Sequence, residues 1–140
     1  MSKIIIAAFF VMLLAGCASS GRGSYKSYTA ESFPVASGGL VVDDLAERIQ
    51  SAYPPGQTVV YLTGKDEFGM ALENKLRGYG FTVVPEPESE ALTVGWTVNQ
   101  LEPGFWYLLV RLSDGYRFSR VYTDNGQTII PDGGLSQSKF

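Results

Sequence analysis

The last third of the chain constrains the fold more than any other part. Residues 92–101 alternate between apolar and polar side chains, which is the period of a half-buried β-strand. Residues 105–113 form a longer apolar run, and residues 116–123 follow them after Asp114-Gly115, a dipeptide typical of two-residue hairpin turns. The pattern predicts a meander of three antiparallel strands.

Helical periodicity dominates the middle of the chain. Residues 40–53 carry apolar side chains at helical spacing and end at a proline pair, before which a helix is disfavoured. A second apolar stripe runs over residues 68–79 and ends at Gly80, a favoured helix stop. Thr63 and Asp66 precede this stripe with the spacing of a capping box. We therefore expect two amphipathic helices.

Two short strands and an uncertain tail complete the pattern. Residues 58–63 and 81–84 are short β-branched runs, which predict strands, and residues 127–130 could add a short edge strand. The elements follow the order α-β-α-β-β-β-β. This order predicts an α+β fold, a two-layer domain in which two helices pack on one face of a small, mainly antiparallel sheet. We place the domain at residues 40–126 and the tail at residues 127–140.

The N-terminus has the features of an export signal. Lys3 precedes an uncharged run over residues 4–14. That length is within the roughly 7–15 residues of a signal-peptide core and below the roughly 20 of a membrane span. The run ends in Leu14-Ala15-Gly16-Cys17, which resembles the bacterial lipobox read by lipoprotein signal peptidase. We expect residues 1–16 to be a lipoprotein signal peptide and Cys17 to be the lipid-attachment residue.

The residue after the cysteine bears on the destination of the protein. It is Ala18 rather than aspartate, which by resemblance to enterobacterial sorting rules favours the outer membrane, in the inner leaflet and facing the periplasm. The covalent lipid would be an N-acyl diacylglyceryl cysteine (thioether plus amide-linked fatty acid such as palmitate), and no other cofactor is expected. Two alternatives stay open: an ordinary cleaved signal, or a buried apolar helix with an incidental cysteine.

The segment after the cysteine has the composition of a linker. Ten of the 22 residues from 18 to 39 are Ser or Gly, which is typical of a flexible coil with an r.m.s. span of about 25 Å. We expect residues 17–39 to be the lipidated cysteine and a flexible tether. Without Lys3, the 11 basic residues become 10 against 14 acidic ones. The resulting net charge of -4 gives no reason to expect binding to anionic lipid.

Composition also excludes several kinds of site. The chain has no histidine and one cysteine, which excludes Ser-His-Asp and Cys-His catalysis, His-liganded zinc and an internal disulfide. The acidic balance gives no electrostatic footprint for direct nucleic-acid binding. Glu86, Glu88 and Glu90 alternate in a loop but lack the spacing of a calcium loop. Asp43-Asp44 are explained as charges in the first turn of a helix. We expect no enzyme activity, no metal site and no small-molecule substrate.

The hairpin indicates a candidate protein interface. If Asp114-Gly115 is a two-residue turn, Ser113 pairs with Tyr116, and the apolar residues of this hairpin divide between two faces. One face packs under the helices, with Trp106, Leu108, Val110, Leu112 and Val121. The other face is left uncovered, and its mixture of aromatic residues with arginine is typical of binding hot spots. The candidate interface consists of Phe105, Tyr107, Leu109, Arg111, Phe118, Arg120 and Tyr122. The alternative is that the tail, or a different register, covers this face within the monomer.

Several short motifs follow one another along the chain. They are the lipobox, Tyr53-Pro54-Pro55, Phe68-Gly69 before Ala71-Leu72, Leu76-Arg77 before Gly80-Phe81, Tyr107, Leu109 and Leu112, and Ser119-Arg120 before Tyr122 and Gly126. In these motifs and their order the chain resembles TrbH, a family of small conjugal-transfer lipoproteins. The resemblance covers the lipobox and residues 50–126.

The resemblance implies a place in the mating-pair-formation apparatus, a type IV secretion system that moves DNA between cells. The chain would be a structural subunit of the outer-membrane core complex, joining larger channel proteins in a hetero-oligomeric ring, with its lipid at Cys17. Some counterparts carry a small α/β domain similar to the N0 modules of secretins. An alternative function is a free periplasmic lipoprotein that binds cell-wall fragments or a small ligand, since aromatic residues also stack on sugars.

Overall fold

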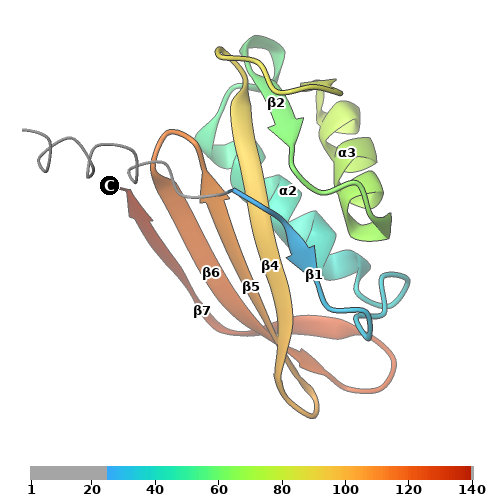
Figure 1. Ribbon diagram of the computed structural model, residues 1–140. Helices are drawn as coiled ribbons and strands as arrows, with labels where there is room; N and C mark the ends of the chain where they lie inside the picture. The colour runs from blue at the N-terminus through green and yellow to red at the C-terminus, as the bar shows by residue number, and fades with distance from the viewer. Residues whose placement is uncertain (1–24, 140) are drawn as a thin grey trace, which may run out of the picture.

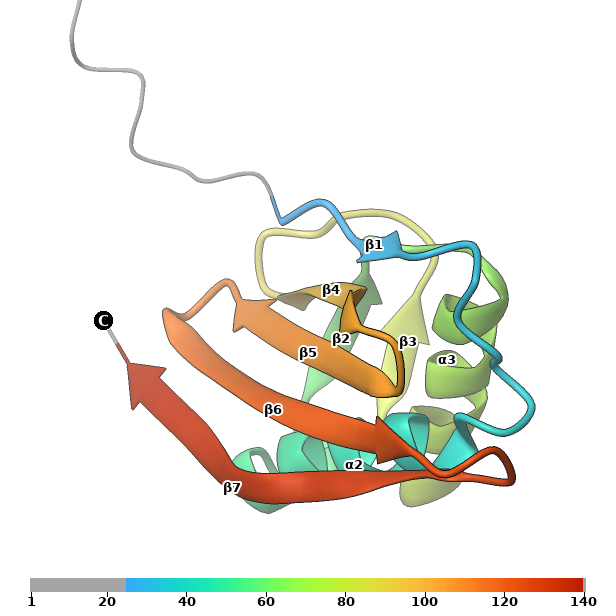
Figure 2. The same cartoon turned by 90° about the horizontal axis from the view of Figure 1, so that it is seen from below.

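A computed structural model describes residues 25–139 of the chain. Within this range two α-helices, α2 (Gly39–Ala52) and α3 (Glu67–Tyr79), lie on one face of a seven-stranded sheet (Figure 1; Figure 2). The predicted α+β class and its two layers are confirmed. The expected signal peptide, its lipobox and the lipid-attachment residue Cys17 lie outside the described residues.

The strands follow the order β3-β2-β4-β5-β6-β7 across the sheet, and β1 pairs with β4 on the same side as β2. Their bounds are β1 Tyr28–Thr29, β2 Val59–Leu62, β3 Thr82–Val84, β4 Leu92–Glu102, β5 Phe105–Leu112, β6 Tyr116–Asp124 and β7 Ile129–Lys139. The pairs from β4 to β7 are antiparallel, whereas β1, β2 and β3 pair in parallel. A 3-10 turn, η1 (Pro55–Gln57), connects α2 to β2.

The second helix begins and ends at residues whose chemistry suits a helix terminus. Asp66 is the N-cap of α3, and its Oδ1 accepts a hydrogen bond of 2.9 Å from the backbone N–H of Gly69. Gly80 ends the helix with a φ of +100°, a backbone conformation in which glycine lacks the steric cost of a side chain. Thr63 is not the cap that the sequence predicts, because its hydroxyl donates to the carbonyl oxygen of Tyr25 instead.

The hydrophobic core lies between the helices and the sheet. The alternating residues Val94, Trp96 and Val98 of β4 are all buried on the helix side, as the sequence predicts. Phe68 of α3 packs against Trp96 with ring centroids 5.4 Å apart. Both helices therefore bury their apolar stripes against the predicted strands. Helix α2 and strand β5 add nine further buried residues to this core, namely Val41, Val42, Leu45, Ala46, Ile49, Trp106, Leu108, Val110 and Leu112.

The register of the β5–β6 hairpin differs from the predicted one by one residue. Arg111 pairs with Arg117 and Val110 with Phe118, so the loop holds three residues rather than two. Gly115 closes this loop with a φ of +92°, as expected for three-residue hairpin loops that end in a left-handed residue. A one-residue shift exchanges the two faces of a strand. The predicted faces are therefore correct for β5 and wrong for β6.

The segment before α2 belongs to the folded domain. Tyr28 and Thr29 pair with β4, and Phe33 is buried, with its ring centroid 5.0 Å from that of Trp106. The expectation of a flexible tether up to residue 39 is therefore wrong for residues 25–39. A serine- and glycine-rich composition does not prevent a segment from binding to the domain where a few of its side chains fit the core.

The tail extends the sheet further than the sequence predicts. β7 pairs with β6 over nearly its whole length, with an irregularity opposite Ser119 and Val121. Ile129 at its start is completely buried, so β7 is tied to the core at that end. None of the helices in residues 25–139 is both long enough and apolar enough to cross a membrane.

Candidate interaction surface

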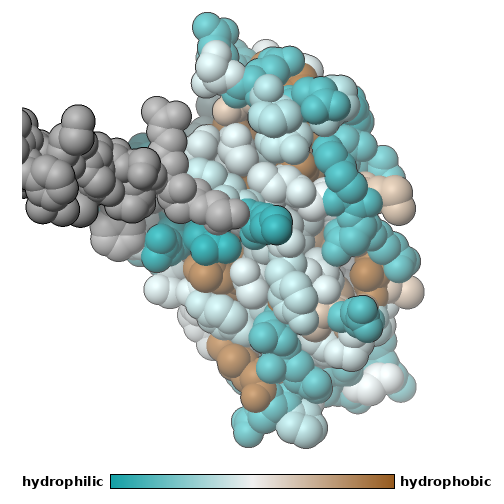
Figure 3. Space-filling model, viewed as in Figure 1, coloured by the Kyte–Doolittle hydropathy of each residue, from teal (hydrophilic) through white to brown (hydrophobic). Residues whose placement is uncertain are grey.

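The side of the sheet that faces away from the helices is the main candidate for an interaction. We call it the open sheet face and define it by Phe105, Tyr107, Leu109, Arg111, Arg117 and Val121. Arg117 is exposed and the other five residues are half-buried. In Figure 3 the surface turned to the viewer is largely of intermediate hydropathy, with scattered hydrophobic patches. No helix covers this side of the sheet in residues 25–139 (Figure 2).

Residues of one chemical kind lie in rows across the open sheet face. Tyr107 is paired with Val121, which makes one apolar row. Arg111 is paired with Arg117, which makes a cationic row at the end of the face near the β5–β6 loop. Leu109 lies between these rows, paired with Ser119. The face is therefore apolar along its middle and positively charged at one end.

The structure brings four of the seven predicted interface residues together on this face, namely Phe105, Tyr107, Leu109 and Arg111. Phe118 and Tyr122 are instead part of the core, with exposed fractions of 2% and 1%. Arg120 also points toward the helices and is therefore not available on the open face. Arg117 and Val121 take their places. The sequence offers one signal for the correct register, because Gly115 can also close a three-residue loop.

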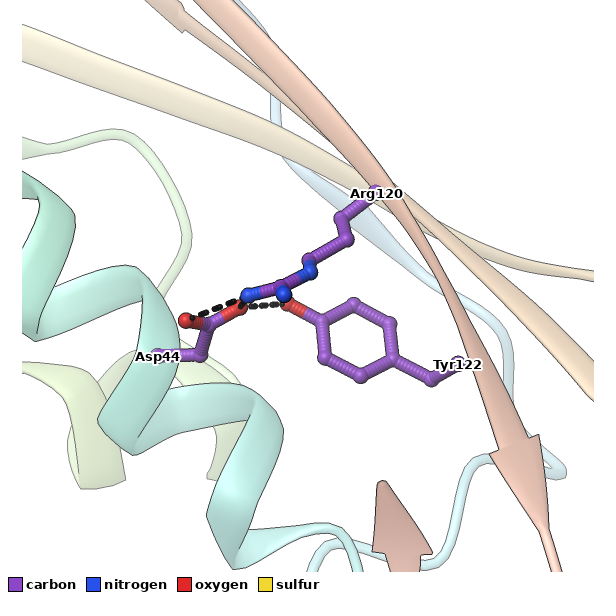
Figure 4. A network of polar contacts seen from close by, with 3 residues as sticks. All are labelled: Asp44, Arg120 and Tyr122. Carbon is purple, nitrogen blue, oxygen red and sulfur yellow. Dashed lines mark hydrogen bonds and ion pairs between the residues drawn. The ribbon is translucent and has the colours of Figure 1, made fainter. Parts of the chain in front are cut away.

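A polar network joins β6 to α2 beneath the sheet (Figure 4). Nη1 of Arg120 lies 3.1 and 3.0 Å from the two carboxylate oxygens of Asp44. The hydroxyl of Tyr122 donates to Asp44 Oδ2 at 2.5 Å. Asp43 and Asp44 both lie beyond the first turn of α2, so their explanation as first-turn helix charges is wrong. The charge of Asp44 is balanced by a residue 76 positions away.

The environment of this network favours the protonated form of the Tyr122 hydroxyl. Burial, and next the hydrogen bond to Asp44, raise the pKa of the Tyr122 hydroxyl above its ordinary value. The side chains of Asp44 and Arg120 are 12% and 21% exposed, so water screens their attraction only partly. The neighbouring Asp43 makes a more exposed ion pair of 3.3 Å with Lys75. The contacts among Asp44, Arg120 and Tyr122 join β6 to α2, and we call these three residues the Asp44 network.

A groove of about 310 Å³ lies between α2 and α3, with Val42 and Ala71 in its lining and the Asp43–Lys75 pair beside it. Among residues 25–139 there is no group of three or more acidic or cysteine side chains that could hold a metal ion. Glu86, Glu88 and Glu90 are exposed in the loop before β4.

Comparison with known proteins identifies the family of the chain that has this open sheet face. Residues 19–139 match the family described as "Conjugal transfer protein TrbH". This chain belongs to the TrbH family. It is also 29% identical over 145 residues to a protein named "Probable conjugal transfer protein TrbH" from Sinorhizobium fredii (strain NBRC 101917 / NGR234), with 97% of each chain covered. No solved structure matches the chain.

Membership in TrbH confirms the resemblance drawn from the sequence motifs and supports a role in conjugation through type IV secretion. The match begins after Cys17 and includes β1 and β7. The TrbH region is thus longer at both ends than residues 50–126, which the motifs cover, and it contains the whole open sheet face. The similarity to secretin N0 modules stays a prediction.

Proposed function

We propose that this TrbH protein is an outer-membrane lipoprotein and a structural subunit of the conjugative type IV secretion core complex, where it anchors larger channel proteins. The observation that carries the proposal is the open sheet face on a chain of a conjugal-transfer family. A face with Phe105, Tyr107 and Leu109 in reach of solvent is suited to a protein partner, since aromatic and aliphatic side chains dominate binding energy at interfaces. The role involves no catalytic step.

The anchor in this proposal is the lipid on Cys17, in the inner leaflet of the outer membrane. The support is the lipobox Leu14-Ala15-Gly16-Cys17 after a short apolar run, and Ala18 at the position that governs sorting. Several acyl chains, each contributing about 0.8 kcal/mol per buried CH₂, make such an anchor effectively permanent. Growth with radiolabelled palmitate should label the wild-type protein and leave the Cys17→Ser variant unlabelled. An unlabelled wild-type protein would exclude the anchor.

The interface is tested by placing a charge in the apolar part of the open sheet face. We expect Tyr107→Glu to leave the thermal midpoint of the domain almost unchanged, because the side chain points away from the core, and to lower conjugation efficiency at least tenfold. Asn74→Glu, on the exposed side of α3, is the matched control and should leave transfer normal. Unfolding of the Tyr107→Glu variant would show instead that this face is part of the fold.

The identity of the partner is tested by purification from detergent extracts. Recovery of large channel proteins in fixed stoichiometry, lost with Tyr107→Glu and kept with Asn74→Glu, is the expected result. Recovery of peptidoglycan alone would contradict the proposal and favour a free periplasmic lipoprotein that binds cell-wall fragments.

A further inference from the structure

The pairing of the strands places the residues of the open side in rows that run from β4 to β7. Residues directly opposite each other in antiparallel strands share a face of the sheet. The row at the end of the face near the β4–β5 turn consists of Glu102, Phe105, Thr123 and Ile130. The next row consists of Asn99, Tyr107, Val121 and Asp132. These two rows together carry a distinct combination of side chains.

Four apolar side chains of the two rows lie close to one another. They are Phe105, Tyr107, Val121 and Ile130. Successive rows on one face are about 7 Å apart, and diagonal neighbours at such distances are within reach of long and aromatic side chains. Ile130 is 41% exposed, and Leu101, at the bulge beside Glu102 on β4, is 59% exposed. Large apolar side chains that are exposed next to one another mark an interaction site.

Two carboxylates flank this apolar group on opposite sides. Glu102 is paired with Phe105 from β4, and Asp132 is paired with Val121 from β7. Both are exposed, and no ion pair among residues 25–139 includes either of them. We call this combination the acid-flanked patch. It consists of Glu102, Phe105, Tyr107, Val121, Ile130 and Asp132.

The positive charges of the sheet lie outside the acid-flanked patch. The strands carry four basic residues, and one of them, Arg120, points to the helix side. Arg111 and Arg117 form a row about 13 Å further along β5. The Asp114 carboxylate is in the loop between them, 3.9 Å from Nζ of Lys139. That end of the face therefore has charges of both signs, whereas the acid-flanked patch has negative charges alone.

The segment that precedes the described residues does not have the chemistry to cover the acid-flanked patch. Residues 18–24 contain no apolar side chain larger than alanine. They lead to Tyr25, whose carbonyl oxygen occupies the space of a Gly95 side chain. Gly95 is paired with Arg111, so the chain enters the domain at the other end of the face.

The same face of a second copy is also a poor match. If the arginines of one copy lie over the carboxylates of the other, the row of Phe105 faces the row of Arg111. Apolar side chains then meet arginine, glycine and serine. If the apolar rows face each other instead, the carboxylates of both copies gather without a cation, and like charges across an interface are unfavourable.

We propose that the acid-flanked patch binds a segment of a channel protein in which apolar side chains have lysine or arginine on both sides. The inference rests on the proposed function, because it names the chemistry of the partner that binds the open sheet face. Glu102 and Asp132 lie three strands apart, about 14 Å across the sheet. The basic residues of the partner stand roughly that far apart, with its apolar residues between them. The two carboxylates select against partners with acidic flanks.

The first test reverses both charges in the full-length protein in donor cells. Glu102→Lys with Asp132→Lys should lower the recovery of channel proteins from detergent extracts, and conjugation, at least about tenfold. Glu86→Lys with Glu88→Lys, in the exposed loop before β4, makes the same change of charge and should leave both normal. Glu102→Gln with Asp132→Gln should lower recovery less and remove most of its dependence on salt concentration.

The second test identifies the segment of the partner. Thr123 lies between Phe105 and Ile130 in the first row, so p-benzoylphenylalanine at this position reacts on illumination with whatever covers the acid-flanked patch. Mass spectrometry of the cross-linked peptide should show an apolar stretch with lysine or arginine on both sides. Changing those basic residues to glutamate should restore recovery with Glu102→Lys and Asp132→Lys, and impair it with the wild type.

Several results would overturn the proposal. They are a cross-linked segment with acidic or uncharged flanks, a cross-link to a second copy of this chain, no cross-link in cells that conjugate normally, and normal recovery after charge reversal. Failure of the proposed function gives a different result, because Tyr107→Glu would then leave both conjugation and the recovery of channel proteins unchanged.

Discussion

At the scale of single residues, Asp44 joins the helix layer to the sheet through polar contacts. Its carboxylate accepts from Arg120 and from Tyr122, both on β6. The side chains of Asp44 and Arg120 are mostly buried, so water has little access to replace the bonds that Asp44 accepts. Removing one partner of such a pair leaves the other uncompensated, which costs more than the pair itself contributes.

The first prediction concerns this carboxylate. Asp44→Asn keeps the shape of the side chain but removes the charge that faces Arg120, so we expect the free energy of unfolding to fall by about 3 kcal/mol. Urea denaturation followed by circular dichroism measures this loss. Asp43→Asn, which removes a surface pair with Lys75, is the control and should change stability far less, because exposed ion pairs contribute little. Equal effects of the two substitutions would contradict a stabilising role for the Asp44 network.

The second prediction follows from the raised pKa of Tyr122. The hydroxyl stays protonated in the folded protein at a pH where it ionises in the unfolded chain, near pH 10. The stability that this provides is complete below pH 10 and is lost as the pH rises above it, by about 1.4 kcal/mol per pH unit. Between pH 9 and 11 the unfolding free energy of Tyr122→Phe should therefore decline less steeply than that of the wild type. Parallel declines would contradict a buried, protonated Tyr122.

At the scale of elements, the N-terminal strand depends on the absence of a side chain at one position. β1 and the residues before it lie against β4, and the carbonyl oxygen of Tyr25 occupies the space of a Gly95 side chain. Gly64 contributes in the same way, because a β-carbon there would meet the ring of Trp96. The sequence does not indicate these close approaches, since a glycine in a strand is also compatible with a bulge or a bend.

The third prediction is that Gly95→Ala displaces this segment. The added β-carbon collides with backbone rather than with a movable side chain, so we expect a loss of about 2 kcal/mol and at least tenfold faster amide exchange at Ala30, whose N–H bonds to the Val98 carbonyl. Gly78→Ala, in the last turn of α3 with open space around it, should instead stabilise the protein, by about 0.5 kcal/mol. Unchanged exchange at Ala30 in Gly95→Ala would contradict the displacement.

The elements themselves were largely predictable, because burial against a single core imposes a period on the sequence. The apolar stripes of both helices and the alternation in β4 follow directly from that period. The register of β6 does not, since Asp114 and Gly115 fit a two-residue loop as well as the observed three-residue loop. The choice is made by packing: Phe118 and Tyr122 fill the space under α2, and local turn chemistry does not report this.

The candidate interface was accordingly predicted on β5 and missed on β6. Tyr107 and Leu109 depend only on the alternation of one strand, whereas Arg117 and Val121 depend on the register between two. The Asp44 network was not predictable either, because its partners lie more than 70 positions apart and an aspartate near the start of a helix already has a local explanation.

At the scale of the whole molecule, both ends of the domain lie outside the boundaries that composition suggests. Phe33, in a serine- and glycine-rich stretch, packs against Trp106 and Phe68. Ile129, in a tail of mixed composition, is fully buried, and β7 pairs with β6 beyond it. The terminal segments thus complete a core that the central residues cannot close alone.

The fourth prediction concerns this completion of the core. Residues 25–140 should fold cooperatively, whereas residues 40–126 should not. Loss of a buried phenylalanine such as Phe33 costs about 3–5 kcal/mol, and loss of β7 leaves the apolar surface around Ile129 in water. A domain of this size has only about 5–15 kcal/mol of stability in total. Urea unfolding monitored by tryptophan fluorescence, with Trp96 and Trp106 as probes, measures the outcome.

Two intermediate chains separate the contributions of the ends. Residues 40–140 lack only the N-terminal segment, and residues 25–126 lack only β7. We expect each to be less stable than residues 25–140, and Phe33→Ala in the longer chain to reproduce most of the loss seen in residues 40–140, because the aromatic ring is the main buried group of that segment. A cooperative transition for residues 40–126, with a midpoint equal to that of residues 25–140, would contradict this prediction. It would show that the two terminal segments pack on the domain without stabilising it.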